Sequence, residues 1–193
     1  VALLRNEFKE WRERSLRSRL DRNIKKVLIT MGGSDADNFT LKVLNELTKS
    51  KNGKKCEFIV IIGGSYISVE SFHEFIKSSE MNVSVFYNVN NMAEIMSEAD
   101  LCIGAAGSTS WERCCLGLPT INISIAKNQE EIVEQLSKRD VSIHSNINNL
   151  RNDFEQFFNA AGRDLQRNLS VNSRRICDGL GVSRVFEELE KNI

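Results

Sequence analysis

Long hydrophobic runs are missing from this sequence. No apolar stretch approaches the roughly 18 residues that a membrane-spanning helix needs, and the charged first segment lacks the apolar centre of a signal peptide. Cysteine is also sparse: the five cysteines are odd in number and none is spaced as C-x-x-C, which argues against a disulfide framework and against a zinc knuckle. A reducing, cytoplasmic location is the resulting expectation.

An excess of charge of one sign is missing too, because 26 basic residues balance 26 acidic ones. No overall field would draw the protein to nucleic acid or to an anionic membrane. The balance is uneven, since residues 1–26 carry nine basic and four acidic side chains, and the later residues carry a compensating negative excess. We expect this first segment to be an amphipathic helix with a solvated basic face, and a polyanion site is the second interpretation.

What the sequence does contain is a regular alternation of strand and helix patterns. Apolar runs of strand length lie at residues 26–31, 57–62, 82–87, 100–103, 119–123 and 141–143. Their nearly continuous Val, Ile and Leu are typical of a parallel sheet covered by helices on both faces. The sequence therefore predicts a Rossmann-like α/β domain of about six strands over residues 26–193, preceded by a connecting helix over 1–25. Three helical patterns, at 149–160, 163–174 and 181–191, are expected to pack over the sheet.

Ligands of an open parallel sheet bind beyond the carboxyl ends of its strands, so the loops after the strands are candidate sites. In the loop at 31–38, glycines could bring backbone N–H groups close to a phosphate, and a tight turn capped by Ser34 or Asp35 is an equal alternative. This loop is neither a Walker sequence nor a G-x-G-x-x-G fingerprint. The glycines at 63–64 are expected to serve close packing of their loop.

The loop after the fourth predicted strand is rich in small residues and opens a helix. Ser108 and Thr109 could bind phosphate or cap that helix, whose N-terminus favours an anion. Glu112 could accept two hydrogen bonds from vicinal hydroxyls such as those of a ribose, although a carboxylate in a first helical turn commonly serves only the helix dipole. After the fifth strand, Asn128 and Gln129 could reach the hydroxyls of a sugar, with helix capping by Asn128 as the alternative.

Residues suited to proton transfer are scarce. His73 and His144 have no partner evident in the sequence, and we expect both to be ordinary surface or packing residues. Cys114 and Cys115 are expected to be buried rather than reactive. The residues therefore indicate binding of an anion and a diol without an evident acid or base.

The run GAAGSTSWERCCLGLP at residues 104–119 resembles the nucleotide-binding segment of UDP-2,4-diacetamido-2,4,6-trideoxy-β-L-altropyranose hydrolases of pseudaminic acid biosynthesis, and of related spore-coat polysaccharide proteins. Further matches are ALLRNEF near the start, GGSDADN at 32–38, the pair at 128–129, and DGLGVSRV at 178–185. The resemblance implies the C-terminal half of a GT-B-type fold, as in the glycosyltransferase that adds N-acetylglucosamine to the lipid-linked peptidoglycan precursor.

By resemblance, the substrate is a UDP-sugar, and no metal and no cofactor are required. The implied binding residues are Gly33, Ser34, Gly107, Ser108, Thr109, Glu112, Asn128 and Gln129. Among them, Glu112 would hold the ribose hydroxyls and residues 107–109 the diphosphate. Residues 33–34 would face the cleft near the phosphates, and residues 128–129 the sugar.

The family's reaction inverts the anomeric carbon, with water activated by a histidine of an N-terminal domain. That domain is absent from this chain, which begins with Val1 and is expected to be a piece of a longer enzyme. The chain alone should bind uridine nucleotide but hardly turn it over, with the missing domain as its partner and no nucleic acid or membrane partner. Ala36 stands where the family often has proline, which leaves the exact sugar open. Two alternatives remain: a UDP-sugar-dependent GT-B glycosyltransferase domain, and a non-catalytic module that docks a partner through its basic first helix.

Overall fold

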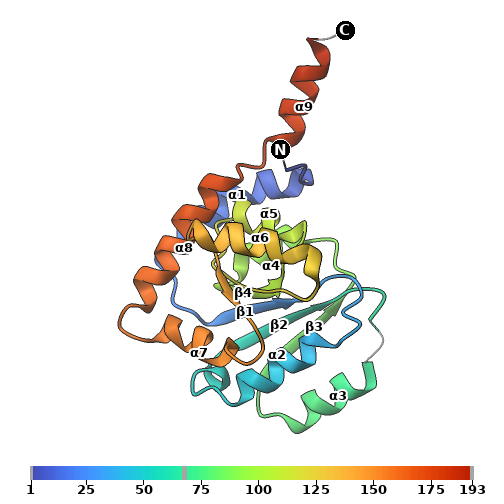
Figure 1. Cartoon of the computed structure of the whole chain (residues 1–193), viewed down its shortest axis with the longest axis vertical. Coiled ribbons are helices and arrows are strands. Elements are labelled where there is room, and N and C mark those ends of the chain that lie inside the picture. The colour runs from blue at the N-terminus through green and yellow to red at the C-terminus, as the bar shows by residue number, and fades with distance from the viewer. Residues whose placement is uncertain (1, 67–68, 192–193) are drawn as a thin grey trace.

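A computed structural model describes residues 2–66 and 69–191. Within these residues, six parallel strands form one sheet in the order β3-β2-β1-β4-β5-β6, with helices on both faces (Figure 1). The strands are β1 (Lys26–Thr30), β2 (Glu57–Ile62), β3 (Asn82–Tyr87), β4 (Leu101–Ala105), β5 (Thr120–Ile123) and β6 (Ile143–Ser145). The predicted Rossmann-like fold is confirmed.

The helices divide between the two faces of the sheet. They are α1 (Asn6–Arg19), α2 (Phe39–Thr48), α3 (Val69–Ser78), α4 (Met92–Glu98), α5 (Thr109–Cys115), α6 (Lys127–Lys138), α7 (Leu150–Glu155), α8 (Gly162–Ile176) and α9 (Gly181–Glu190), with short 3-10 turns at Gly53–Lys55 and Gln156–Phe158. Side chains alternate across a strand, so Val27 and Ile29 pack in the core under α2, α3 and α7. Leu28 packs in the opposite core, under α1, α4 and α5.

The sixth strand is displaced from its predicted position at 141–143. Asp140 has a φ of 51°, and the N–H of Val141 donates to the carbonyl of Leu136 at 2.9 Å, so the apolar Val141 closes the end of α6. The strand then starts at Ile143, and His144 lies on it rather than beyond it. An apolar residue that ends a helix has the same sequence signature as one that starts a strand.

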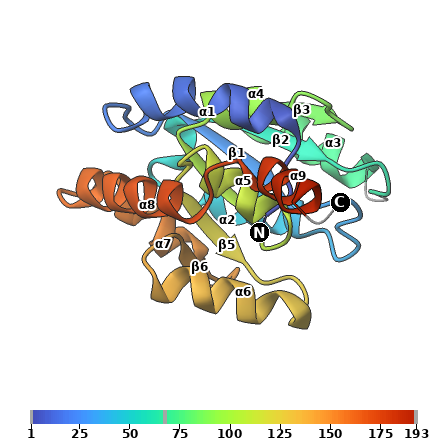
Figure 2. The same ribbon diagram turned by 90° about the horizontal axis from the view of Figure 1, so that it is seen from above.

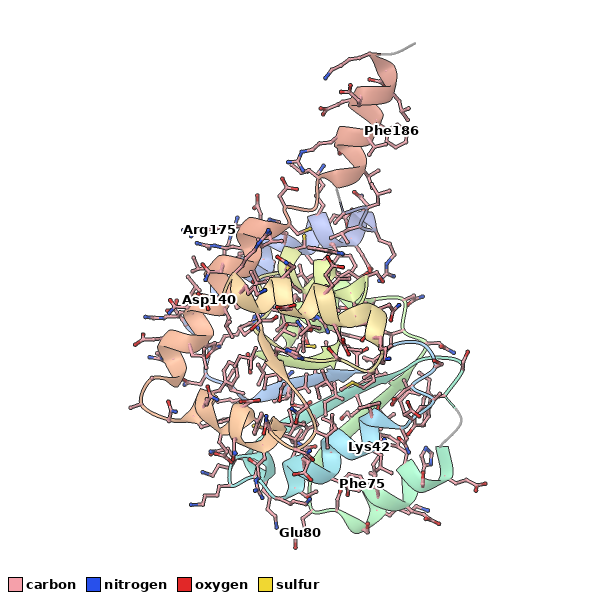
Figure 3. The ribbon with its side chains drawn as sticks, in the orientation of Figure 1. Lys42, Phe75, Glu80, Asp140, Arg175 and Phe186 are labelled. Atoms are coloured by element: carbon pink, nitrogen blue, oxygen red, sulfur yellow. The ribbon has the colours of Figure 1, made fainter. Side chains whose placement is uncertain are left out.

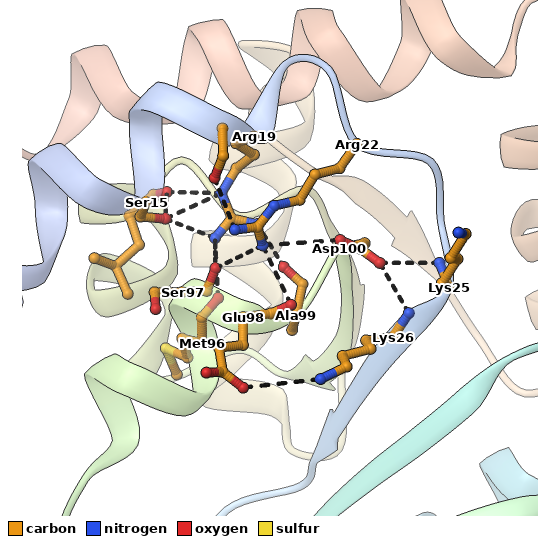
Figure 4. A network of polar contacts seen from close by, with 12 residues as sticks. Ser15, Arg19, Arg22, Lys25, Lys26, Met96, Ser97, Glu98, Ala99 and Asp100 are labelled. Atoms are coloured by element: carbon orange, nitrogen blue, oxygen red, sulfur yellow. Dashed lines mark hydrogen bonds and ion pairs between the residues drawn. The ribbon is translucent and has the colours of Figure 1, made fainter.

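The arginines of α1 correct the prediction of a solvated basic face. Arg14 and Arg17 are exposed, but Arg19 is only 1% exposed. Its guanidinium donates to the carbonyls of Met96 and Ala99, at 3.0 and 2.6 Å, near the end of α4 (Figure 4). The last carbonyls of a helix lack partners within the helix, and a cation also suits the negative end of its dipole. Arg19 therefore ties α1 to the end of α4, and the two helices lie side by side in Figure 2.

Two further arginine contacts extend this arrangement to other helix ends. Arg19 also donates to the carbonyl of Leu116, directly after α5, at 3.0 Å. Arg12 donates to the carbonyls of Arg174 and Cys177, both at 2.8 Å, where α8 ends. Through Arg12 and Arg19, helix α1 is therefore hydrogen-bonded to the C-terminal ends of α4, α5 and α8 and holds them together.

Helix α9 was expected to pack over the sheet and instead projects from the body (Figure 1). Its apolar stripe is exposed, with Phe186 62% and Leu189 57% accessible, and Figure 3 labels Phe186 on the projecting arm. The direction of α9 is set by the junction before it. Asp178 accepts hydrogen bonds from the Arg184 guanidinium and from the N–H of Leu180. Gly179 has a φ of 80°, a region that favours glycine.

The cysteines are all free and buried. Cys114 and Cys115 are 3% and 0% exposed, which confirms the expectation that they are buried. None of the helices in the described part of the chain has both the length and the apolar character that a membrane crossing requires.

Candidate functional site

The strand order reverses between β1 and β4, which are neighbours at the centre of the sheet. The chain leaves β1 toward α2 on one face and leaves β4 toward α5 on the other face. Two loops that diverge in this way leave a crevice at the carboxyl edge, where open α/β sheets bind ligands. Thr30 and Gly104 are register partners, so the two loops start side by side. The structure therefore brings the glycine-rich loops predicted from the sequence to one place.

The loop after β1 is closed by its own side chains. The Asp35 carboxylate accepts from the N–H groups of Phe39 and Thr40 at 2.7 and 2.8 Å. Asn38 accepts from the N–H of Leu41 at 3.3 Å. The capping alternative is thus confirmed in part: the Asp35 carboxylate accepts from the first N–H groups of α2, but the N-cap residue is Asn38, and within the described residues no hydrogen bond shows Ser34 as a cap. The first N–H groups of α2 are occupied, and Gly33 and Ser34 are exposed beside them.

The glycine at the end of β2 fixes this loop from the other side. A Cβ atom on Gly63 would lie 2.3 Å from the carbonyl oxygen of Gly33, and the N–H of Ser65 donates to that oxygen at 3.2 Å. The expected close packing of the loop at 63–65 is confirmed.

Gly63→Ala is expected to lower the free energy of unfolding by about 1–3 kcal/mol, because the added methyl group meets backbone atoms that have no room to move. Urea denaturation followed by circular dichroism measures the change. Gly33→Ala is the matched control, since a Cβ there meets nothing within 4 Å, and it should stay within about 0.5 kcal/mol of the original protein. Equal stability of both variants would contradict the packing described here.

The loop after β4 differs, because no described side chain of the loop caps the helix that follows it. We call residues 106–108 and the start of α5 the open loop. The side chain of Ser108 makes no capping hydrogen bond to α5. The carbonyls of Gly107 and Ser108 accept from the N–H groups of Ser110 and Trp111, at 3.0 and 3.1 Å. Within the described residues, the N–H groups of residues 107–109 have no acceptor. A Cβ on Gly107 would meet nothing within 4 Å, so packing within the chain does not require glycine there.

Glu112 lies one helical turn after Ser108. Its side chain is 16% exposed, and one carboxylate oxygen is 3.7 Å from Nη2 of Arg5, which is half-exposed. Burial raises the pKa of Glu112, the positive charges of Arg5 and Arg113 oppose that rise, and Glu7 adds to it. At 3.7 Å the contact with Arg5 is too long for a hydrogen bond, so both carboxylate oxygens can still accept from a ligand.

The third predicted position, at the start of α6, is only partly free. Asn128 is exposed, and α6 has no side-chain cap, so the alternative that Asn128 caps the helix is wrong. The side-chain oxygen of Gln129 accepts from the N–H of Ile125 at 3.3 Å and thus joins the first turn of α6 to the loop before it. Because β5 adjoins β4, this loop lies next to the open one.

The two histidines lie away from the reversal point. His73 is on α3 with Nε2 2.9 Å from the Tyr87 hydroxyl, and His144 is on the edge strand β6. Both are exposed, which confirms the interpretation of surface residues.

A buried arginine under the open loop was missed by sequence reasoning. Arg113 is 1% exposed, and its Nη2 donates to the carbonyl of Ala105 at 2.8 Å and to the Ser110 hydroxyl at 3.0 Å. Gly104 was the available signal, because a glycine inside a strand often marks a place where another group approaches the backbone. A Cβ on Gly104 would lie 2.2 Å from Nη1 of Arg113.

Comparison with known proteins places this geometry in a family. Three relatives span much of the chain: an uncharacterized protein of Methanocaldococcus jannaschii, 32% identical over 146 residues (75% of this chain, 30% of the relative); the spore coat polysaccharide biosynthesis protein SpsG of Bacillus subtilis, 22% identical over 175 residues (89% and 51%); and the UDP-2,4-diacetamido-2,4,6-trideoxy-beta-L-altropyranose hydrolase of Campylobacter jejuni, 27% identical over 142 residues (74% and 48%). The chain thus spans about half or less of the length of these relatives.

The fold agrees with a solved structure as well. MurG of Acinetobacter baumannii superposes with a TM-score of 0.70 at 19% identity, over 94% of this chain and 53% of that one. The family model of the glycosyltransferase family 28 C-terminal domain matches residues 26–169, from β1 into α8. The chain therefore belongs to the glycosyltransferase family 28 C-terminal domains.

Proposed function

We propose that the chain is the UDP-binding domain of an inverting UDP-sugar hydrolase, which releases UDP and a free 2,4-diacetamido-2,4,6-trideoxyhexose in pseudaminic acid biosynthesis. The observation that carries the proposal is the contrast between the two loops at the strand reversal. The N-terminus of α2 is capped by Asp35, whereas the N–H groups of residues 107–109 have no acceptor in the described chain. The hydrolase relative from Campylobacter jejuni supports the choice of substrate class.

In this proposal the chain acts mainly on the leaving group. The N–H groups of residues 107–109 and the hydroxyls of Ser108 and Thr109 bind the diphosphate, and Glu112 binds the ribose. As the bond to the anomeric carbon breaks, negative charge grows on the departing UDP, and donors fixed in place stabilise it without rearranging. Loss of one such donor typically costs roughly 2.7–4 kcal/mol of activation free energy. As the resemblance to the hydrolase family implies, the base that activates water would be a histidine of an N-terminal domain, and both histidines of this chain lie away from the reversal point.

A glycosyltransferase domain is the second candidate, and the name of the matching family favours it. The two reactions differ in their need for an acceptor. Incubation of the full-length protein with its UDP-sugar in the absence of acceptor should give UDP and free reducing sugar. Strict dependence of UDP release on an added acceptor would show a transferase instead.

Partner docking through the basic helix is the third candidate, and the contacts of its arginines give this candidate little support. Arg12, Arg19 and Arg22 donate to carbonyls of the same chain and are not free for a partner. Calorimetry with UDP separates the candidates. Micromolar binding, tighter for UDP than for UMP, supports the nucleotide site, and absent or millimolar binding supports the docking module.

Gly107→Ala is expected to weaken UDP binding three- to tenfold without destabilising the fold. The added methyl group has open space in the chain but would stand where the diphosphate approaches the backbone. Calorimetry measures the affinity and thermal unfolding measures the stability, which should be unchanged or slightly raised. Uridine serves as the control ligand, because it lacks the diphosphate and should bind both proteins equally. Unchanged affinity for UDP would remove the diphosphate from this loop.

A further inference from the structure

We propose that Arg113 is a positioning residue of the open loop: its buried guanidinium ties the end of β4 to the start of α5, and so holds the N–H groups of residues 107–109 in the arrangement that receives an anion. The identity of that anion as a diphosphate rests on the proposed function. The tie itself rests on the contacts of Arg113 alone.

First, one nitrogen atom of Arg113 donates to groups on both sides of the loop. Nη2 of Arg113 donates to the carbonyl of Ala105, the last residue of β4, and to the hydroxyl of Ser110, the second residue of α5. These two acceptors bracket the loop on both sides. The same nitrogen lies 3.1 Å from the side-chain oxygen of Asn122 on β5, and Asn122 donates onward to the hydroxyl of Ser142 at 2.7 Å. The loop is therefore anchored to the neighbouring strand and not merely to itself.

The second observation is the space made for the guanidinium. The position that a Cβ atom of Gly104 would occupy is 2.2 Å from Nη1 of Arg113 and 3.0 Å from the carbonyl oxygen of Thr30. Any larger residue at this point of β4 would displace the guanidinium. Because Gly104 pairs with Thr30, the guanidinium lies at the strand reversal, directly under the open loop.

The third observation is the charge. The hydrogen-bond acceptors of Arg113 are a carbonyl, a hydroxyl, an amide oxygen and the Cys102 thiol, all of them neutral. Its Nε has no partner in the described residues, and Glu112 makes its ion pair with Arg5 instead. Charged side chains are rarely buried without a paired opposite charge. Arg113 thus has no ion-pair partner within 4.0 Å in the described residues, and its positive charge, which also acts on the neighbouring Glu112, can stabilise an anion held on the other side of the loop.

The test uses the 193-residue chain without ligand, by NMR relaxation of its backbone amides. In Arg113→Lys the ammonium group keeps the charge, but the lysine side chain is shorter and cannot place a nitrogen where Nη2 donates to both acceptors. The order parameters of residues 107–109 should fall from the rigid range of about 0.85 to below about 0.6. Ser110→Ala removes one end of the tie and should give a smaller fall. Ser173→Ala is the matched control: Ser173 is 1% exposed and lines a small cavity together with Ser110 and Arg113, but its hydroxyl donates to the carbonyl of Ser170.

UDP titration supplies the second readout. Relative to Ser173→Ala, the Kd for UDP should rise about fivefold in Arg113→Lys and about threefold in Ser110→Ala, with the Kd for uridine unchanged. Order parameters and affinities that match the control in both variants would overturn the proposal, and if Arg113→Lys does not fold, Ser110→Ala decides alone. If the original protein fails to bind UDP, the proposed function is lost, while the order parameters still decide whether Arg113 fixes the loop.

Discussion

Replacement of Arg19 by methionine is expected to lower the free energy of unfolding by about 3–4 kcal/mol, the largest loss of stability that we anticipate. Methionine preserves much of the apolar stem but leaves the carbonyls of Met96 and Ala99 without their Arg19 donor, whereas the carbonyl of Leu116 keeps the Ser15 hydroxyl at 2.8 Å. Each buried acceptor left unpaired costs about 1–3 kcal/mol, and partial relaxation of α1 keeps the total below the sum. Thermal unfolding should show a Tm lower by roughly 6–16 °C for a domain of this size.

The control for this prediction lies on the same helix. Arg17 is 81% exposed at its side chain and, among the described residues, pairs only with Glu13, so Arg17→Met should change the stability by less than about 0.5 kcal/mol. If the two substitutions lowered the Tm equally, the loss would come from the helical propensity or net charge of α1. The role of Arg19 in holding the helix ends together would then be wrong.

Glu112→Gln is expected to weaken UDP binding at least tenfold, about 1.4 kcal/mol, if the proposed function is right. A carboxylate accepts two charge-assisted hydrogen bonds from the ribose hydroxyls, and an amide of the same size accepts only neutral ones. Titration with UDP and with 2′-deoxy-UDP isolates this contact. The original protein should prefer UDP, and Glu112→Gln should show a clearly smaller preference, because its amide accepts only neutral hydrogen bonds. Glu130→Gln, at an exposed position of α6, is the control.

The pH dependence of binding follows from the same side chain. Burial raises the pKa of Glu112 above that of an ordinary glutamate. Only the ionised carboxylate accepts from both hydroxyls, so protonation competes with UDP, and affinity should decline as the pH falls through this raised pKa. The decline should begin at a higher pH than an ordinary glutamate would give. The part caused by the carboxylate should be lost in Glu112→Gln, whereas the part caused by the secondary ionisation of the UDP phosphate, with a pKa of about 6, remains in both proteins. The same pH dependence in the original protein and in Glu112→Gln would exclude Glu112 from the nucleotide contact.

The apolar runs predicted most of the sheet because strands buried on both faces are nearly continuous in Val, Ile and Leu. The predictions from apolar runs failed where an apolar residue does something other than start a strand or pack on the sheet. Val141 ends α6 instead of starting β6, and the stripe of α9 shows the period of an amphipathic helix without telling what covers it. The periodicity of apolar residues identifies the apolar face of a helix. It does not identify what packs against that face, because this depends on residues far away in the sequence.

The site was predictable to the level of its loops, since carboxyl ends of parallel strands meet at one edge. Which loop is open could not be read, because Asp35 and Ser108 both belong to residue types that cap helices, and only Asp35 does so here. The buried arginines were missed for a related reason. A charged residue is expected at the surface, and the carbonyls that accept from Arg19 at the end of α4 lie more than 70 residues away along the chain.

Because α9 projects from the body, we expect it to unfold locally, separately from the cooperative unfolding of the sheet and the helices packed on it. A helix of 10 residues is marginal on its own in water, and this one keeps most of its apolar stripe in solvent. Its order therefore depends on the few contacts at the turn formed by Asp178 and Gly179, which join it to the body. Helix α9 can therefore unwind and reform while the sheet stays folded, together with the helices whose ends are hydrogen-bonded to Arg12 and Arg19.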